Sequence, residues 1–270
     1  MMLKKRLITA AIALPLLFLL IFKGGQVSFT IFIGALSVIT LWEYFRIVYL
    51  DSNKGGKGFI RFFAYLISLG IVWAAHIKSF ELIVWFLLLN LIISGMASLR
   101  LFRTDPSAPI ILAKQVLGVI YIPLFLSFLV LIRNGTDGIF WVLSVIVIVF
   151  LGDSGAYFAG SGFGKHKLSP TISPGKTVEG SIVGLVTSVV AGVIVKLLFF
   201  PDLPWGMGVL FFLVIGIFAQ VGDLFESVFK RHANIKDSGD VLPGHGGFLD
   251  RVDALMFAAP AGYFFIQYVF

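Results

Sequence analysis

The stretch GIFWVLSVIVIVFLGDSGAYFA (residues 138–159) decides the fold class, because it is a long apolar run with one charged residue, Asp153. A helix of this length rises about 30 Å, which matches the hydrocarbon thickness of a bilayer. The stretch therefore predicts a membrane-spanning helix with one acidic side chain at membrane depth, where an unpaired carboxylate is costly and a positive partner is expected.

Apolar runs of similar length recur along the chain of 270 residues, of which 59% are hydrophobic and 13% charged, with a mean hydropathy of +1.00. Soluble domains carry about 25% charged residues. We therefore predict an all-α polytopic integral membrane protein. It forms one membrane unit, with helices 1–5 in residues 1–135 and helices 6–9, with two cytoplasmic loops, in residues 136–270. The nine predicted spans are 7–22, 27–46, 59–77, 80–99, 110–131, 138–159, 179–200, 205–229 and 250–270.

The basic residues predict which side each loop faces. Of the 21 Lys and Arg, 17 lie in alternate gaps that share a side with the amino terminus, and four lie on the other side. Short loops rich in Lys and Arg stay cytoplasmic, so the amino terminus is predicted inside and the carboxyl terminus outside, in a cell inner membrane. The formal charge of +7 is dispersed among these loops, and no nucleic-acid partner is expected.

Cysteine is absent from the sequence, which excludes disulfides, thiolate metal ligands and a cysteine nucleophile. No internal repeat is evident, which disfavours an inverted-repeat transporter. A transporter or channel stays an alternative, because intramembrane carboxylates also mark ion pathways.

Small residues follow one face of the seventh predicted span at intervals of four, which permits close helix contact. Packing within one protomer and a homodimer contact are both open. The residues are Gly180, Gly184, Ser188 and Gly192.

The two longest polar gaps, 160–178 and 230–249, are too short to fold around a core of their own. Any active site must therefore consist of these loops and the helix ends beside them. Acidic residues gather there, and carboxylates that converge from separate helices are typical Mg²⁺ ligands. The helix dipole explains one acid at position 250 or 253, but not Asp223. The predicted metal ligands are Asp223, Asp250, Asp253 and Asp153, with a second cation left open.

Cations and exposed backbone amides occur together in both loops, as polyphosphate binding requires. PGKT, residues 174–177, is not a Walker A motif, because Pro170 stands where a glycine is needed and a membrane helix precedes. For Arg231, the alternative explanation is an ordinary solvated loop residue. For His245, it is a purely local hydrogen bond. The predicted substrate-binding residues are Lys167, Ser169, Ser173, Lys176, Thr177, Lys230, Arg231, Gly246 and Gly247. The predicted catalytic residues are Asp223, Asp250, Lys236, His245 and Arg251.

The segment from Ser227 to Asp253 resembles the signature of phosphatidate cytidylyltransferases, with its Lys-Arg, Lys-Asp, Pro, His-Gly-Gly and Asp-Arg-x-Asp elements in register. DSGAYFAGSGFGKHKLSPTISPGKTVEGS, residues 153–181, resembles the second marked region of that family. The two regions cover roughly a quarter of the chain.

The resemblance implies a Mg²⁺-dependent nucleotidyltransferase that transfers CMP from CTP to phosphatidate, giving CDP-diacylglycerol and pyrophosphate for phospholipid biosynthesis. Its partners would be CTP, phosphatidate and the lipid bilayer, with the active site facing the cytoplasm. The closest alternative is a related CTP-using lipid enzyme, either a cytidylyltransferase for another lipid phosphate or a polyprenol kinase.

Overall fold

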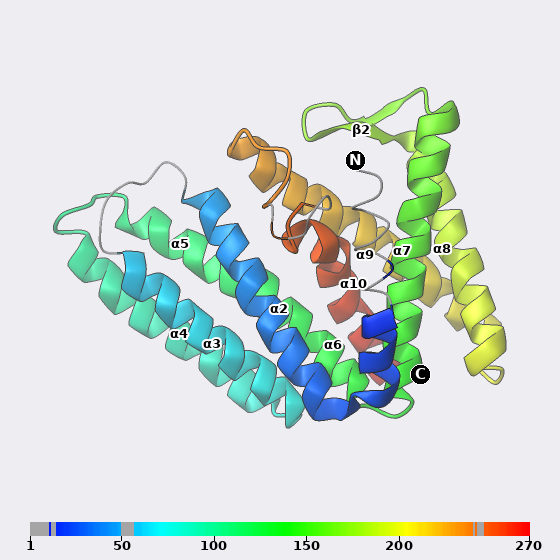
Figure 1. The fold of residues 1–270 in the computed structure, drawn as a ribbon, viewed down its shortest axis with the longest axis horizontal. Coiled ribbons are helices and arrows are strands. Elements are labelled where there is room, and N and C mark those ends of the chain that lie inside the picture. The colour runs from blue at the N-terminus through cyan, green and yellow to red at the C-terminus, as the bar shows by residue number, and fades with distance from the viewer. Residues whose placement is uncertain (1–10, 12–14, 50–56, 240, 242–245) are drawn as a thin grey trace. The chain divides into compact units, whose positions relative to one another are not determined.

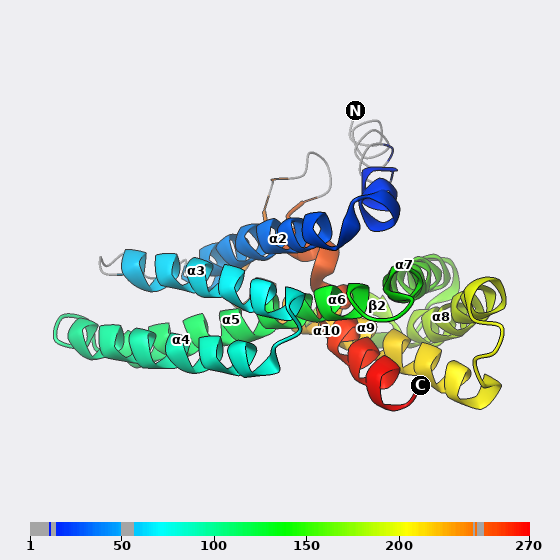
Figure 2. The ribbon, with the colours of Figure 1, turned by 90° about the horizontal axis from the view of Figure 1, so that it is seen from below.

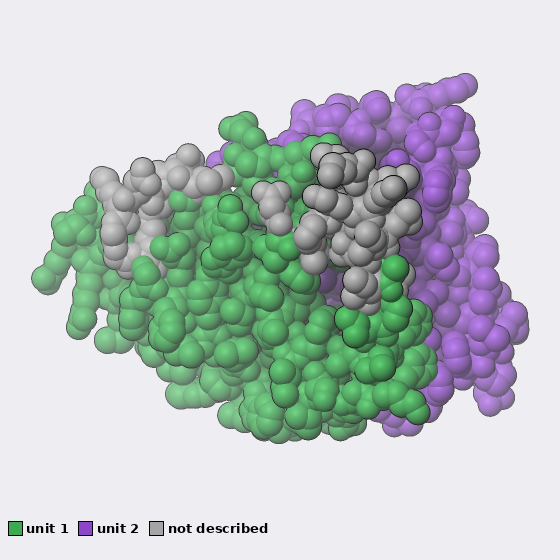
Figure 3. Space-filling model, in the orientation of Figure 1, with its two compact units in different colours: residues 1–134, 233–251 green, residues 135–232, 252–270 purple. Residues whose placement is uncertain are grey.

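The computed structural model describes residues 11, 15–49, 57–239, 241 and 246–270. The chain forms two compact units, which Figure 3 colours separately. Unit 1 comprises Met1–Asn134 and Ala233–Arg251, and unit 2 comprises Gly135–His232 and Val252–Phe270. The loop after residue 232 therefore belongs with the N-terminal helices.

Unit 1 is a bundle of long apolar helices. Helix α3 packs against both α2 and α4, and α4 packs against α5; Figure 2 shows α2 and α3 lying over α4 and α5. Helices α5 and α6 form one span through the π-helical turn η1, which contains Pro123. The proline lacks an N–H, so the wider turn accommodates the missing hydrogen bond. The elements are α2 (Gly25–Val48), α3 (Lys57–His76), α4 (Phe80–Leu101), α5 (Ala108–Val119), η1 (Ile120–Leu124) and α6 (Phe125–Arg133).

Hydrogen bonds tie the helix ends of unit 1 together. At one end, Lys114 Nζ donates to the carbonyl of Val48 at 2.6 Å, and the Tyr44 hydroxyl donates to the carbonyl of Lys114 at 3.0 Å. At the other end, Asn134 Nδ2 donates to the carbonyl of His76 at 2.9 Å. Helix ends that the basic residues assign to one side of the membrane therefore lie together.

Unit 2 consists of three long helices, a hairpin and most of a fourth helix. Helix α8 packs against both α7 and α9. The antiparallel hairpin pairs Lys167 with Thr177 and Ser169 with Ser173, and Figure 1 shows it at one end of α7 and α8. The sequence predicted a rigid, proline-containing loop at this position, without strands. The elements are α7 (Gly138–Phe163), β1 (Lys167–Ser169), β2 (Ser173–Thr177), α8 (Val178–Phe199), α9 (Trp205–His232) and α10 (Leu249–Tyr268).

The strip of small residues on α8 is used for packing inside unit 2. A Cβ added at Gly192 would lie 2.1 Å from the ring of Phe212, on α9. A Cβ added at Gly184 would lie 2.9 Å from the Cβ of Ala156, on α7. The neighbouring helices of the same protomer thus fill this face, which is one of the two explanations that the sequence left open.

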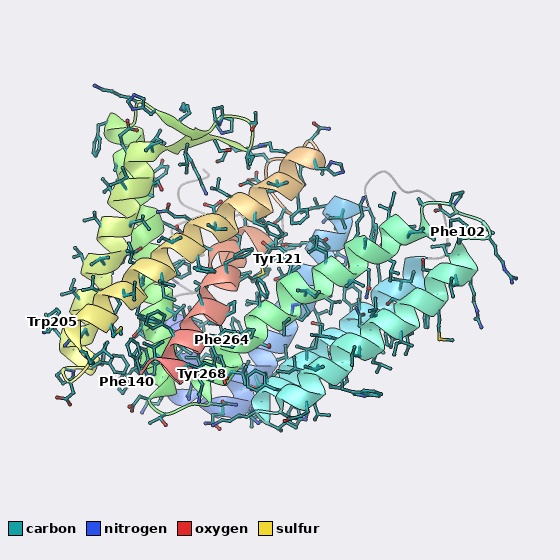
Figure 4. The ribbon with its side chains drawn as sticks, turned by 180° about the vertical axis from the view of Figure 1, so that it is seen from behind. Phe102, Tyr121, Phe140, Trp205, Phe264 and Tyr268 are labelled. Atoms are coloured by element: carbon teal, nitrogen blue, oxygen red, sulfur yellow. The ribbon has the colours of Figure 1, made fainter. Side chains whose placement is uncertain are left out.

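Aromatic side chains gather at the end of unit 2 away from the hairpin, where Figure 4 labels Phe140, Trp205 and Tyr268. The Lys196 ammonium lies 4.3 Å from the ring centroid of Trp205 and donates to the carbonyl of Pro201 at 2.8 Å. Such aromatic groups are typical of membrane–water interfaces.

Seven helices of the described residues are long and apolar enough to cross a membrane. They match the second to eighth predicted spans to within four residues at either end. Residues 7–10 and 12–14 of the predicted first span, 7–22, lie outside the described residues. Helix α10 covers the predicted ninth span but is not among the seven, and three charged residues stand near its start: Asp250, Arg251 and Asp253. Over its described residues, the chain is an all-α polytopic membrane protein with one small hairpin.

Candidate active site

One face of α9 carries alternating charges near its C-terminal end. Asp223, Glu226 and Lys230 are three and four residues apart, so they lie above one another on the helix. Glu226 is fully buried and forms an ion pair with Lys230. Asp223 Oδ2 forms an ion pair of 2.5 Å with Lys176 Nζ, which β2 supplies. The hairpin is thus connected to α9 through opposite charges.

Two further carboxylates extend this group within unit 2. Asp253, on α10, is buried and interacts electrostatically with Asp223, Glu226 and Lys230. Asp153, on α7, interacts with Asp223 and Lys176. We call Asp153, Asp223, Glu226 and Asp253 the acidic cluster. Because like charges repel strongly in a low-dielectric environment, the cluster needs cations. Lys176 and Lys230 already supply two positive charges.

The hairpin is held by Arg231 and Thr177, which the sequence analysis assigned to substrate, and by Glu179, which it did not. Arg231 Nε donates to the carbonyl of Ile172 at 2.9 Å, between β1 and β2. Thr177 Oγ1 accepts from the amide of Gly180 at 3.1 Å and so caps α8. The side chain of Glu179 accepts the backbone N–H of Lys165 at 3.1 Å. These contacts fix the loop, while Lys167 is exposed to solvent.

In unit 1, Asp250 organises the loop that leads into α10. Its Oδ2 accepts the backbone N–H groups of Ser238 and Gly247 and the Ser238 hydroxyl, each at 2.9 Å. Gly246 has φ +81°, a conformation that glycine adopts without strain. A Cβ on Gly246 would lie 2.8 Å from the same Asp250 oxygen. The Gly-Gly pair therefore lets the backbone wrap closely around Asp250.

Glu43, in the middle of the C-terminal half of α2, was missed by the sequence analysis. Its side chain is fully buried, and Oε2 accepts the amide of Leu249 at 2.8 Å. Oε1 accepts the amide of Phe248 at 3.1 Å, and the Ser238 hydroxyl lies 3.3 Å from Oε2. An acidic residue inside a predicted membrane span is itself a signal of function, and Glu43 is the one acid of the predicted span 27–46.

The remaining predicted residues divide into exposed and undescribed ones. Lys236 and Arg251 are exposed, and His245 lies outside the described residues. Throughout the described part of the chain, no three His, Asp or Glu side chains are grouped so that they could hold a metal ion. Mg²⁺ commonly binds through one or two carboxylates, completed by water and substrate phosphates. The acidic cluster supplies oxygen donors of that type.

Comparison with known proteins identifies the family. Residues 4–269 match the cytidylyltransferase family. The chain belongs to this family. It is 35% identical over 268 residues to the phosphatidate cytidylyltransferase of Bacillus subtilis (strain 168), with 97% of each chain covered. It is 36% identical over 264 residues to that of Staphylococcus haemolyticus (strain JCSC1435), with 95% of this chain and 96% of the relative covered.

In this cytidylyltransferase, the segments 153–181 and 227–253, which carry the family resemblance, both supply residues to the charged site. Asp153 and Lys176 come from the segment 153–181, and Lys230 and Asp253 come from the segment 227–253. Asp223 lies outside both segments but pairs with Lys176. The hairpin and the C-terminal end of α9 therefore form one charged site in unit 2.

Proposed function

We propose that this chain is a phosphatidate cytidylyltransferase, which makes CDP-diacylglycerol from CTP and phosphatidate. The observation that carries the proposal is the similarity to relatives of that name along nearly the whole chain, including 97% coverage with the Bacillus subtilis enzyme. The charged site in unit 2 adds the chemistry that such a reaction needs.

In the proposed reaction, a phosphate oxygen of phosphatidate attacks the α-phosphorus of CTP. A phosphorus–oxygen bond forms there, and the bond between the α-phosphorus and the bridging oxygen to the β-phosphate breaks. Pyrophosphate leaves with the electron pair. The lipid phosphate is already ionised near neutral pH, so the enzyme must chiefly align two anions and offset their repulsion.

The residues of the site fit that task. We assign Lys176, Lys230 and Arg231 to binding phosphate groups, with Lys176 exchanging its contact with Asp223 for a substrate phosphate. The same hairpin contains four further predicted substrate-binding residues: Lys167, Ser169, Ser173 and Thr177. The loop before α10 and the first turn of α10 contain Lys236, His245, Gly246, Gly247 and Arg251. Bound Mg²⁺ would neutralise phosphate charge there. Its proposed ligands are drawn from Asp223, Asp250, Asp253 and Asp153, and a second cation is compatible with this number of acids.

We also propose nine spans, a cytoplasmic amino terminus and a site that faces the cytoplasm at the inner membrane. Two observations support this topology. In unit 1, Glu43 near the end of α2 contacts Leu249 at the start of α10. In unit 2, the hairpin contacts the end of α9 through Lys176 and Asp223. Within each unit, loops rich in Lys and Arg are therefore at the same end, as the positive-inside rule requires.

The deciding experiment incubates the purified protein with radiolabelled CTP, Mg²⁺ and phosphatidate and follows label into the lipid fraction. Label should appear only when phosphatidate is present, and pyrophosphate should be released in equal amount. Label transferred instead to another lipid phosphate, or phosphorylation of a polyprenol, would replace the proposal with a related CTP-using activity. Solute flux in liposomes without CTP would point to a transporter.

A further inference from the structure

We propose that Glu43 is a positioning residue of the reaction: from α2, its carboxylate holds Ser238, Phe248 and the start of α10 in the conformation that catalysis requires. This inference rests on the proposed function, and it gives the N-terminal helices a role in catalysis. The argument needs only contacts within unit 1.

The first step is the hydrogen-bond pattern of the carboxylate. The amides at a helix N-terminus have no partner within the helix. Glu43 accepts two backbone amides there, those of Phe248 at 3.1 Å and Leu249 at 2.8 Å. The negative charge also lies where the helix dipole stabilises it. A residue of α2 thus caps α10 across a separation of 206 positions in the sequence.

The second step is that Glu43 and Asp250 hold the same loop through a shared hydroxyl. Ser238 Oγ lies 2.9 Å from Asp250 Oδ2 and 3.3 Å from Glu43 Oε2. A hydroxyl carries a single hydrogen, so the shorter distance assigns the donation to Asp250. The position of Asp250 therefore depends on Ser238, and the Glu43 carboxylate packs against the same hydroxyl.

The third step is steric. A Cβ on Gly247 would lie 2.6 Å from Glu43 Oε2 and 2.1 Å from Ser238 Oγ. A Cβ on Gly239 would lie 2.9 Å from Glu43 Oε1. The loop can approach the carboxylate this closely only because both positions are glycine. Gly247, which the sequence analysis assigned to substrate binding, thus also serves the contact with α2.

The test compares Glu43→Gln with a control that also breaks a buried polar contact. Glutamine keeps the volume, but its NH₂ group would face an amide donor, so at least one backbone contact is lost. The control is Asn90→Leu, which removes the buried amide pair of Asn90 and Gln115 in the same unit, where Gln115 Nε2 donates to Asn90 Oδ1 at 2.6 Å. Melting temperature, kcat and the KM for CTP are measured for each purified protein.

Both variants should lower the melting temperature, but only Glu43→Gln should lower kcat, by about 10- to 100-fold, because small displacements of reacting groups cost this much. The KM for CTP should change far less. Equal kcat for Glu43→Gln and Asn90→Leu would overturn the proposal. If Glu43→Gln fails to fold, Glu43→Asp replaces it, because the shorter side chain withdraws the carboxylate from the two amides, and full kcat in that variant would equally overturn the proposal.

A second readout separates this proposal from the proposed function. Hydrogen exchange of the Phe248 and Leu249 amides should be faster in Glu43→Gln than in Asn90→Leu. If the wild-type protein makes no labelled lipid, the assigned function fails, while faster exchange would still support the positioning of the loop. Equal hydrogen-exchange rates of these two amides in both variants would contradict the positioning role, whatever the activity of the wild-type protein.

Discussion

Lys176 on β2 and Asp223 on α9 form an ion pair of 2.5 Å, with about a third or less of each side chain exposed. The pair joins the hairpin to the membrane helix at the acidic cluster. Because solvent reaches both groups, the contact can be exchanged for contacts with substrate, and the two residues can be tested separately.

Asp223→Asn should reduce turnover by roughly 10³-fold or more, because it removes the charge on which we base cation binding. Membrane insertion should be unaffected. Asp202→Asn is the matched control, since Asp202 is exposed in the turn between α8 and α9. Initial rates over a Mg²⁺ titration provide the measurement, and near-normal turnover at any Mg²⁺ concentration would refute the metal role of Asp223.

Lys176→Gln should raise the KM for CTP or for phosphatidate by about tenfold, which corresponds to the loss of one charge-assisted hydrogen bond. The affected substrate identifies the phosphate that Lys176 binds. Lys23→Gln, on an exposed residue before α2, serves as the control. Steady-state kinetics with each substrate varied in turn would contradict the assignment if both KM values matched those of the control.

Gly246→Ala should destabilise the loop by about 1 kcal/mol or more, because φ is +81° and a Cβ would crowd Asp250. Gly246→Asn should be milder in conformational cost, since asparagine tolerates this region better than other residues. Gly95→Ala is the control, because a Cβ there meets nothing within 4 Å. Thermal unfolding in detergent measures the effect, and equal melting temperatures for the two alanine variants would count against it.

Gly192→Ala should lower stability by about 1–3 kcal/mol through overlap with Phe212, without a change in oligomeric state. Gly206→Ala is the control, with open space around the added Cβ. Thermal unfolding and light scattering are measured together. A changed oligomeric state with unchanged unfolding would instead assign the strip to a contact between protomers.

The absence of native cysteine makes the topology directly testable. Thr171→Cys, between β1 and β2, should react with a membrane-impermeant thiol reagent only when the cytoplasmic face is accessible. Asp202→Cys, in the turn after α8, should react from the opposite side. The reverse pattern of labelling in sealed vesicles would overturn the proposed orientation.

Hydrophobic length predicted the second to eighth spans well, because a helix in lipid must satisfy its own backbone over a fixed thickness. The hairpin was not predicted, since β1 and β2 are three and five residues long and contain or border prolines. Asp223 and Lys176 were both named from sequence, but their pairing depends on tertiary structure. Glu43 was not predicted, because it is a single acid in a mostly apolar helix and its partner Leu249 lies 206 positions away in the sequence.

The contact between Glu43 and the start of α10 can form only late in synthesis of the chain. The ribosome produces Glu43 early, and Leu249 follows 206 positions later. At about 5–20 residues per second, the wait is roughly 10–40 s. Throughout that interval the Glu43 carboxylate lacks its two amide donors, so water or another polar group must take their place. A polypeptide that terminates before α10 would lack these donors permanently, so its second span would keep a carboxylate that only the full chain satisfies.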